Sequence, residues 1–448
     1  MMKQRQLWTS RGVLALIALL VSACGSSPDV GLAGPGLQPQ ATTGVVNRLS
    51  AFRYVHTLAG VPATETPSTL KSLYGGQVLV YDPVARTAVL ANNSSAKGKY
   101  DAAVESNTRV YKVAEQGLAA WSSGYNAWGS GYNAWGSGYN AWGSGTTSSA
   151  TTFTENIVNW DAIGLSSAQA LVPEQGSGIK VAVIDTGIDL NHPGLQGRLD
   201  LANGKDYVQG DLDPSEVNGN TDGTYSQGYG HGTAVAGIIA QVAPKATILA
   251  LRVLDPFGEG DVATVADAIN YAVLKGAKVI NLSLGSNADV KALNTAVSAA
   301  IGKGIVVVAA AGNSGDTNVL FPAAPADYLT GSQGQGSVGV GSVTGTFLKS
   351  SFSTYGHHLE LTAPGERIRT LFPGGNVVDA TGTSFAAPVV SGILALALST
   401  GLNITESSGA KALMGNLNST ARPGSDPAYP NGLGFGTVSA FRLVDVYR

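Results

Sequence analysis

Residues 381–392 read Thr381-Gly382-Thr383-Ser384-Phe385-Ala386-Ala387-Pro388-Val389-Val390-Ser391-Gly392. After its first glycine, this stretch is a run of small and apolar residues, the pattern of a buried helix. A serine at the start of such a helix is either an N-cap or a nucleophile, because the free N–H groups and the helix dipole stabilise negative charge there. A hydroxyl is a weak nucleophile, so catalysis by Ser384 also requires a base, a group that orients the base and an oxyanion donor.

The composition limits the class of protein. The chain has 448 residues, enough for a catalytic domain of about 250–300 residues and smaller pieces. Charged residues make up 13%, about half of the ~25% usual in globular proteins, which excludes a largely disordered chain. The net charge of −3 gives no electrostatic case for nucleic acid as a partner. Cys24 is the only cysteine, so an intramolecular disulfide is impossible.

The amino terminus has the pattern of an export signal. Three basic residues precede the apolar run 13–21, which is too short to span a bilayer because a spanning helix needs about 20 apolar residues. Residues 1–23 are therefore predicted to be a signal peptide. Val21-Ser22-Ala23-Cys24 resembles a bacterial lipobox, in which Cys24 becomes the lipidated first residue and anchors the protein to a membrane. The alternative is an ordinary signal peptide with an incidental cysteine. In both cases the protein is exported, either as a cell-envelope lipoprotein or, after processing, outside the cell.

A small folded unit is predicted to follow a flexible tether at residues 24–47. In residues 48–115, apolar and β-branched runs alternate with short helical patterns. The order is β-α-β-β-α-β, which is the ferredoxin-like α+β arrangement. The predicted strands are 51–58, 77–81, 86–91 and 108–114, and the predicted helices are 67–74 and 100–106.

A repeat occupies residues 116–152. The sequence Gly-Tyr-Asn-Ala-Trp-Gly-Ser occurs three times, at 124–130, 131–137 and 138–144. Two glycines per seven residues argue against a helix, because each costs about 1 kcal/mol there. The segment is interpreted as a low-complexity linker. The alternative is a strip of Tyr and Trp side chains that binds a glycan or the protein's own surface.

Residues 153–448 change to alternating strands and helices. Continuous apolar runs of this length are typical of buried parallel strands. Strands that alternate with helices indicate a doubly wound α/β fold with a mostly parallel sheet, whose sites lie at the carboxyl ends of the strands. The predicted strands are 179–185, 246–253, 278–284 and 305–311, and the predicted helices are 233–241, 264–275 and 288–303.

Two further segments place reactive side chains where that rule predicts them. Val181-Ala182-Val183-Ile184-Asp185 ends a buried strand with a carboxylate, and Gly230-His231-Gly232-Thr233 opens a helix with a histidine. Each residue alone is more often a cap or a surface residue. Together with Ser384 they give an acid, a base and a nucleophile in the chain order Asp, His, Ser.

At these motifs the chain resembles the subtilisin-like serine proteases, or subtilases, over residues 153–448. The resemblance implies an exported serine endopeptidase that hydrolyses polypeptides and works as a monomer without a required cofactor. It implies that Asp185, His231 and Ser384 are catalytic. In Ala311-Gly312-Asn313-Ser314-Gly315, it implies that Asn313 is the oxyanion donor.

The resemblance also implies a groove that binds an extended peptide through its main chain, which favours broad specificity. Phe321-Pro322-Ala323 resembles the family's segment beside the first pocket, whose proline is typically cis. The substrate-binding residues that the resemblance implies are Ser283, Leu284, Gly285, Gly258, Gly260 and Gly312.

The chain departs from the family's pattern at Ala234, Phe385 and Val389, for which we expect altered packing rather than inactivity. The helix after His231 has no insertion where some subtilases carry a calcium loop, so that site is expected to be absent. The adjacent His357-His358 is interpreted as exposed loop, not a zinc site. An acidic loop is either a solvated surface or a calcium site with oxygen ligands; its residues are Asp206, Asp211, Asp213, Glu216 and Asp222.

Subtilases commonly carry a ferredoxin-like propeptide that aids folding and blocks the groove until it is cleaved. Residues 48–115 have a suitable size and element order, so the resemblance implies this role for them and makes them a partner of residues 153–448. The alternative to the whole interpretation is a catalytically silent lipoprotein that uses the groove or the aromatic repeat for surface binding. The intact set of Asp185, His231, Asn313 and Ser384 speaks against it.

Overall fold

A computed structural model describes residues 49, 51–112, 153–324, 338–424 and 426–448. The predicted signal peptide with Cys24, the tether and the aromatic repeat lie outside the described residues. All described residues belong to one compact unit. For clarity, residues 51–112 are called the front unit and residues 153–448 the main unit.

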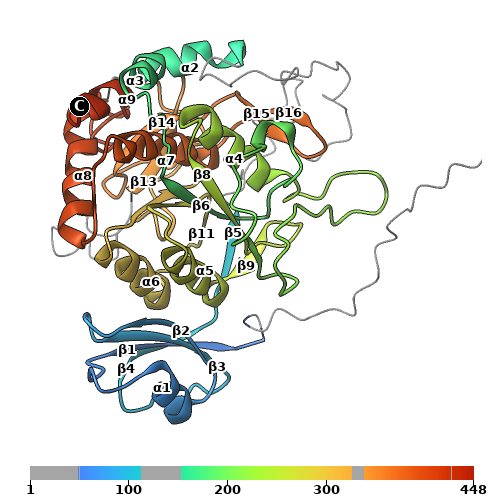
Figure 1. Cartoon of the computed structure of the whole chain (residues 1–448), viewed down its shortest axis with the longest axis vertical. Helices are drawn as coiled ribbons and strands as arrows, with labels where there is room; N and C mark the ends of the chain where they lie inside the picture. Colours follow the sequence, from blue (N-terminus) through green and yellow to red (C-terminus); the bar gives the residue numbers. More distant parts are fainter. Residues whose placement is uncertain (1–48, 50, 113–152, 325–337, 425) are drawn as a thin grey trace, which may run out of the picture. The chain divides into compact units, whose positions relative to one another are not determined.

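The front unit is a four-stranded antiparallel sheet with one helix (Figure 1). The strands lie in the order β2-β3-β1-β4, so each of the two central strands has a partner on both sides. A capping box formed by Thr66 and Thr69 starts the helix. The elements are β1 (Tyr54–Ala59), α1 (Pro67–Tyr74), β2 (Gln77–Asp82), β3 (Thr87–Asn92) and β4 (Asp101–Ser106).

The predicted second helix of this unit is wrong, because residues 101–106 form strand β4 instead. Six or seven residues are too few for a stable isolated helix, and the free edge of β1 offers them backbone partners. The loop before β4 is fixed to β1 by the ring of His56. Its Nδ1 lies 3.0 Å from Asp101 Oδ1, and its Nε2 lies 2.7 Å from Ser94 O. The last predicted strand becomes β5 (Arg109–Lys112), which leaves this sheet and joins the main unit.

The main unit is built on a seven-stranded sheet in the order β14-β13-β12-β10-β6-β8-β7, and every pair in it is parallel. The prediction of a doubly wound α/β fold is therefore confirmed, and the four predicted strands are found within a few residues of their expected bounds. The strands are β6 (Lys180–Asp185), β7 (Lys205–Asp206), β8 (Thr247–Arg252), β10 (Val279–Leu282), β12 (Val306–Ala310), β13 (Val338–Val343) and β14 (Leu361–Pro364).

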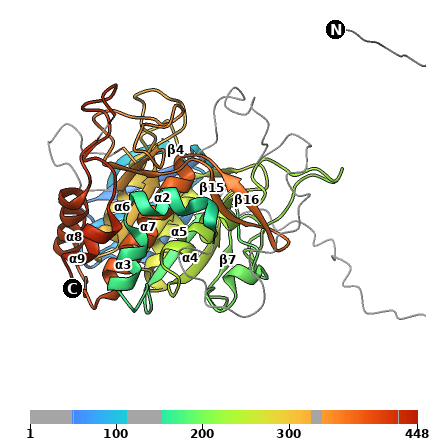
Figure 2. The ribbon, with the colours of Figure 1, turned by 90° about the horizontal axis from the view of Figure 1, so that it is seen from above.

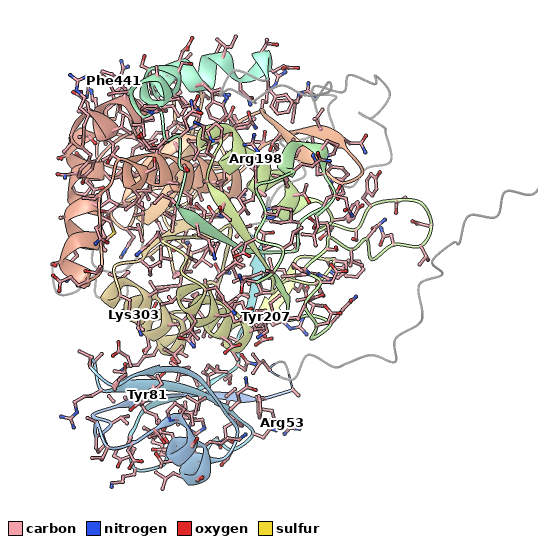
Figure 3. All side chains as sticks on the ribbon, in the orientation of Figure 1. Arg53, Tyr81, Arg198, Tyr207, Lys303 and Phe441 are labelled. Atoms are coloured by element: carbon pink, nitrogen blue, oxygen red, sulfur yellow. The ribbon has the colours of Figure 1, made fainter. Side chains whose placement is uncertain are left out.

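Helices cover both faces of this sheet (Figure 1). On one face lie α4 (His231–Val242) and α7 (Thr383–Ser399), and on the other lie α5 (Val262–Leu274) and α6 (Lys291–Gly302). The carboxyl end of α4 is fixed by Arg198 (Figure 3), which donates to Ala240 O at 3.0 Å and to Pro244 O at 2.6 Å. A cation at this end of a helix also complements the helix dipole.

Every residue of α7 is buried. A helix that is apolar on all sides belongs in the centre of a large domain, and α7 packs on β10, β12, β13 and β14 as well as on α4. The sequence interpretation of residues 381–392 as the start of a buried helix is confirmed.

A three-stranded antiparallel sheet joins the front unit to the main unit. Its central strand is β5, which lies between β9 (Glu259–Asp261) and β11 (Leu284–Gly285) of the main unit. Side chains add to this junction: Ala263 N donates to Asn107 Oδ1 at 3.0 Å, and Lys291 N donates to Glu105 Oε1 at 3.1 Å.

The remaining elements complete the periphery. Figures 1 and 2 both show α8 and α9 at one end of the main unit and the β15–β16 hairpin at the other. The elements are α2 (Ile157–Ala162), α3 (Leu165–Leu171), β15 (Ile368–Phe372), β16 (Asn376–Ala380), α8 (Ser407–Thr420), α9 (Ala440–Asp445) and two 3₁₀ turns (Thr154–Asn156 and Pro193–Leu195).

Candidate active site

The three side chains predicted to react come from three elements of the main unit. Asp185 is the last residue of β6, His231 is the first residue of α4, and Ser384 is the second residue of α7. Their exposed fractions are 1%, 3% and 1%. The structure therefore brings together, in a buried place at the carboxyl end of β6, residues that lie 46 and 153 positions apart in the sequence.

The aspartate and the histidine are in direct contact. His231 Nδ1 lies 2.7 Å from Asp185 Oδ1, and the same carboxylate oxygen accepts a hydrogen bond from Thr186 N at 2.7 Å. Because a carboxylate oxygen only accepts, Nδ1 carries the proton in the neutral imidazole. The Nε2 atom is then the basic nitrogen of His231.

Two glycines allow the three elements to come this close. A Cβ on Gly232 would lie 2.1 Å from Gly187 O and 3.2 Å from Asp185 Cβ, so a side chain there would push the histidine helix off the aspartate strand. A Cβ on Gly392 would lie 2.6 Å from Val242 Cβ, so a side chain there would separate α7 from α4. Both positions need glycine for the space it leaves.

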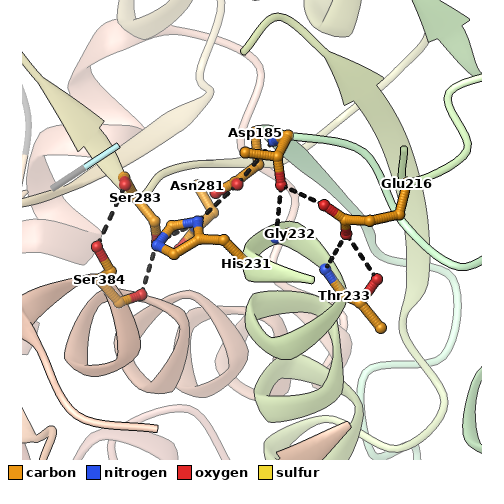
Figure 4. Close-up of polar contacts among 9 residues, drawn as sticks. Asp185, Glu216, His231, Gly232, Thr233, Asn281, Ser283 and Ser384 are labelled. Carbon is orange, nitrogen blue, oxygen red and sulfur yellow. Dashed lines mark hydrogen bonds and ion pairs between the residues drawn. The ribbon is translucent and has the colours of Figure 1, made fainter. Parts of the chain in front are cut away.

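The serine is fixed from the strand side of the site. Ser283 Oγ donates to Ser384 O at 2.7 Å, and Ser384 Oγ donates to Ser283 O at 3.3 Å. Asn281 Nδ2 in turn donates to Ser283 Oγ at 2.9 Å, and Ser391 Oγ donates to Asn281 Oδ1 at 2.9 Å. Figure 4 shows the side chains of Ser384 and His231 pointing toward one another.

The departure at Phe385 has a structural consequence. Its ring centroid lies 5.4 Å from that of His231, with the rings tilted by 54°. The aromatic ring therefore packs against the imidazole. The other two departures, Ala234 and Val389, are buried.

Asn313 lies beside the start of α7. Its Oδ1 accepts hydrogen bonds from Thr383 N and from Thr383 Oγ1, each at 2.9 Å. These two bonds orient the amide, so its NH₂ group points away from Thr383. Gly312 N donates to Thr383 Oγ1 at 3.2 Å, which ties the same loop to the residue before Ser384.

The two segments predicted to bind a peptide main chain lie on either side of β5. Tyr111 pairs with Glu259 of β9 and with Gly285 of β11, and Lys112 pairs with Leu284. Beyond β11, Ser286 and Phe321 exchange two backbone bonds of 2.9 Å, and the Phe321-Pro322 bond is cis. An extended chain is thus bound between β9 and β11 in this structure.

Asp206 of the acidic loop is engaged in an ion pair with Arg252, and its neighbours Asp211 and Asp213 bind backbone N–H groups. Asp206 Oδ2 lies 2.7 Å from Arg252 Nη1 in a fully buried ion pair, and Asp206 Oδ1 accepts from Val208 N and Gln209 N. Asp211 and Asp213 each accept a backbone N–H two residues on. The Arg252 guanidinium supplies the positive charge beside Asp206. In the described part of the chain, no three His, Cys, Asp or Glu side chains gather to hold a metal ion.

Glu216, which the sequence places in the same acidic loop, lies next to the Asp185–His231 pair instead. Its carboxylate contacts Thr186 and Thr233, the neighbours of Asp185 and His231 (Figure 4). Glu216 lies near the site because of the path that the loop between β7 and α4 takes. The sequence of this loop has no helix or strand periodicity, so that path could not be predicted.

Comparison with known proteins decides the family. The model of the family described as "Subtilase family" matches residues 176–436, more than half of the chain. The chain belongs to the subtilase family. As a subtilase it is a serine endopeptidase.

The relatives of this subtilase are also proteases by name. Thermitase of Thermoactinomyces vulgaris is 42% identical over 247 residues, which are 53% of this chain and 81% of that protein. A thermophilic serine proteinase of Bacillus sp. (strain AK1) is 40% identical over 52% of this chain, and subtilisin E of Bacillus subtilis (strain 168) is 40% identical over 50%. Each of these two alignments covers 56% of the relative, so this chain spans about half the length of those proteins. A solved structure of a cold adapted subtilisin-like serine proteinase matches with a TM-score of 0.49 at 32% identity, covering 58% of this chain and 88% of that one.

Within the described residues of this subtilase, no helix combines the length and the apolar character needed to cross a bilayer.

Proposed function

We propose that Asp185, His231 and Ser384 are the catalytic triad of this subtilase and that Asn313 completes its oxyanion hole. The observation that carries the proposal is the contact of 2.7 Å between His231 Nδ1 and Asp185 Oδ1, with Ser384 facing the same ring (Figure 4). This arrangement leaves the opposite nitrogen of the imidazole as the base for the serine hydroxyl.

The reaction follows from these positions. Ser384 Oγ attacks the peptide carbonyl carbon while His231 takes its proton, and His231 then gives that proton to the leaving amine. Asp185 holds the proton on Nδ1 and stabilises the imidazolium. The Asn313 amide and the Ser384 backbone N–H bind the oxyanion, and one such donor is worth about 3–4 kcal/mol. Water then hydrolyses the acyl-enzyme by the same steps.

The substrate is an extended polypeptide that lies between β9 and β11. The place and pairing of β5 support this, because β5 makes antiparallel ladders with both strands. Contacts of this kind read the main chain more than the side chains, so we expect broad specificity. Ser283, Leu284, Gly285, Gly258 and Gly260 belong to the two binding segments, and Gly312 lies beside the start of α7, where its N–H donates to Thr383 Oγ1.

The front unit serves as an inhibitory propeptide that covers the groove until it is cleaved. The occupation of the groove by β5 supports this role. Residues 1–23 direct export, and Cys24 carries a lipid anchor that keeps the protein at the cell envelope. The intact mass of the protein from its native host tests both: a diacylglycerol-sized increment on a chain beginning at Cys24 is expected, and an unmodified amino terminus would contradict the anchor.

Hydrolysis of casein tests the central proposal. We expect the wild-type protein to release peptides and a serine-directed phosphonate to stop the reaction with one label per chain, at Ser384. The Ser384→Ala protein should neither hydrolyse casein nor take up the label. Casein hydrolysis that survives Ser384→Ala would contradict the triad.

A further inference from the structure

Glu216 links the strand that carries Asp185 to the helix that carries His231. The loop around Glu216 is held to the chain after β6 by two backbone bonds. Ile188 N donates to Pro214 O at 3.0 Å, and Glu216 N donates to Ile188 O at 3.2 Å. These bonds set the Glu216 side chain between the end of β6 and the first turn of α4.

The carboxylate contacts both elements at once (Figure 4). Glu216 Oε1 accepts from Thr186 Oγ1 at 2.6 Å, and Glu216 Oε2 accepts from Thr233 Oγ1 at 2.8 Å and from Thr233 N at 3.2 Å. Thr186 directly follows Asp185, and Thr233 lies two residues after His231. Among side chains, an ionised carboxylate is suited to this position because it only accepts and has about four lone-pair sites.

The two threonine hydroxyls also accept hydrogen bonds from the backbone of the opposite element. Thr186 Oγ1 accepts from Gly232 N at 3.0 Å, and Thr233 Oγ1 accepts from Asp189 N at 2.8 Å. Each hydroxyl therefore gives its proton to Glu216 and receives one from the other element. The result is a closed network around the Asp185–His231 contact, with Glu216 at its centre.

Burial makes it costly to ionise a carboxyl group at this position, which indicates that Glu216 has a functional role. Burial raises the pKa of the Glu216 carboxyl to about 7, and the nearby charge of Asp185 acts in the same direction against the two threonine donors. A neutral side chain could cap α4 without this cost, but it would not accept from both threonines together.

We propose that Glu216 is a positioning residue of this enzyme, which holds the imidazole of His231 in line between Asp185 and Ser384 by joining Thr186 to Thr233. The inference rests on the proposed triad. Glu216 acts through the two threonines and does not touch the substrate. Misplacement of a catalytic group by about 1 Å can cost about 100-fold in rate, so loss of the link should lower kcat while leaving the binding groove intact.

The test compares Glu216→Ala and Glu216→Gln with a matched control. Glu360→Ala removes another buried carboxylate, which accepts a hydrogen bond from Asn418 Nδ2 away from the site and has a pKa that burial raises. Each precursor is matured with a trace of tagged wild-type enzyme that is then removed. The measurements are kcat and KM on a chromogenic peptide, active sites counted by a fluorophosphonate, and the melting temperature.

We expect Glu216→Ala to lower kcat per active site by about 10- to 100-fold with KM changed by less than about threefold. Glu216→Gln keeps an oxygen for Thr233 and a polar group for Thr186, so it should return kcat to within about fivefold of the wild type. Glu360→Ala should lower the melting temperature but keep kcat within about twofold. If Glu216→Ala does not fold, Thr186→Val, which removes one hydroxyl of the network, should lower kcat by about tenfold.

Full kcat in folded Glu216→Ala, or in Thr186→Val if the first variant does not fold, would overturn this inference alone. A loss of kcat as large in Glu360→Ala as in Glu216→Ala would also overturn it, because the effect would then follow general stability. A wild-type protein without phosphonate-sensitive activity would instead overturn the proposed triad, and this inference with it.

Discussion

Val110 of the front unit and Gly260 of the main unit lie opposite one another in the antiparallel ladder between β5 and β9. The Val110 side chain is completely buried, and a Cβ on Gly260 would lie 3.4 Å from Val110 Cγ2. The neighbouring ion pair between Arg109 and Glu259, at 2.9 Å, is 69% and 45% exposed. Burial of a valine is worth about 1.5–3 kcal/mol and an exposed ion pair about 0–1 kcal/mol, so the apolar contact outweighs the ion pair.

Val110→Asp should weaken the binding of the front unit to the groove and therefore its inhibition of the enzyme. A loss of about 1.5–3 kcal/mol corresponds to about 10- to 150-fold weaker inhibition. The measurement is the lag before activity appears when the full-length precursor matures, together with the inhibition left in the cleaved but associated complex. The control Arg109→Ala should change inhibition by less than about fivefold. Equal effects of the two variants would contradict the dominance of the buried contact.

The register of β5 predicts the first cleavage of the precursor. Lys112 pairs with Leu284, and Leu284 directly follows Ser283, whose carbonyl accepts the Ser384 hydroxyl. The described part of β5 therefore ends one position short of the nucleophile, and the next residue in the sequence is Val113, which lies outside the described residues. We expect the first product to begin at Ala114, as read by amino-terminal sequencing early in maturation. The Ser384→Ala precursor should stay intact, and a first cut elsewhere in wild-type protein would contradict the register.

Asn313→Ala should lower kcat by about 100- to 1000-fold with KM little changed, because it removes one oxyanion donor that acts in the transition state. The loss is measured with a chromogenic peptide. Asn313→Asp keeps an oxygen for the two Thr383 donors but replaces the NH₂ group with another oxygen, so its kcat should fall at least as far. A tenfold or smaller loss in both variants would rule out the oxyanion role.

The pKa of Glu216 gives a pH dependence of stability. Burial raises the pKa from its ordinary value of 4.5 to about 7, so between these values the folded protein holds a proton that the unfolded chain has lost. The free energy of unfolding contributed by Glu216 therefore falls as the pH rises from about 4.5 to about 7 and is constant above. In the Ser384→Ala background, Glu216→Gln should gain stability relative to its parent between pH 5 and pH 8 in denaturant titrations. The other buried acids titrate in both proteins and cancel, so a difference independent of pH would disprove the shift.

The buried ion pair between Arg252 and Asp206 makes a further prediction. Arg252→Met leaves the buried Asp206 carboxylate without its cation and should lower the free energy of unfolding by about 3–5 kcal/mol. The double variant Arg252→Met/Asp206→Leu removes both charges and should recover most of that loss. Both values come from denaturant titrations in the Ser384→Ala background. A double variant as unstable as Arg252→Met alone would show that the loss comes from packing.

Much of the main unit could be predicted from sequence because its signals are local. The strand ending at Asp185 is a continuous apolar run, and the stretch around Ser384 carries the pattern of a buried helix start. The parallel sheet then dictates where such ends meet. Ser283 and Ser391 help to fix the nucleophile through hydrogen bonds to residues more than 100 positions away in the sequence. A local sequence pattern cannot predict such contacts.

The errors have the same origin. Residues 101–106 contain good helix formers, yet the edge of β1 decides their conformation, and strand formation depends on such pairing more than on intrinsic preference. The sequence places Asp206 in an acidic loop that is either solvated or a calcium site, because its actual partner, Arg252, lies 46 positions away at the end of another strand. Glu216 resembled a member of the same acidic surface because its two threonine partners lie on different elements.

Because α7 is completely buried, the activity of Ser384 depends on the whole domain staying folded. Ser384 belongs to a helix that contacts five strands of the large sheet as well as the histidine helix, so a partial opening that displaced it would have to expose the central core. Elements of this kind exchange their amide hydrogens only when the entire domain opens. Heat inactivation of this protease should accordingly be an all-or-none event, with catalytic competence and the ordered interior vanishing at one temperature.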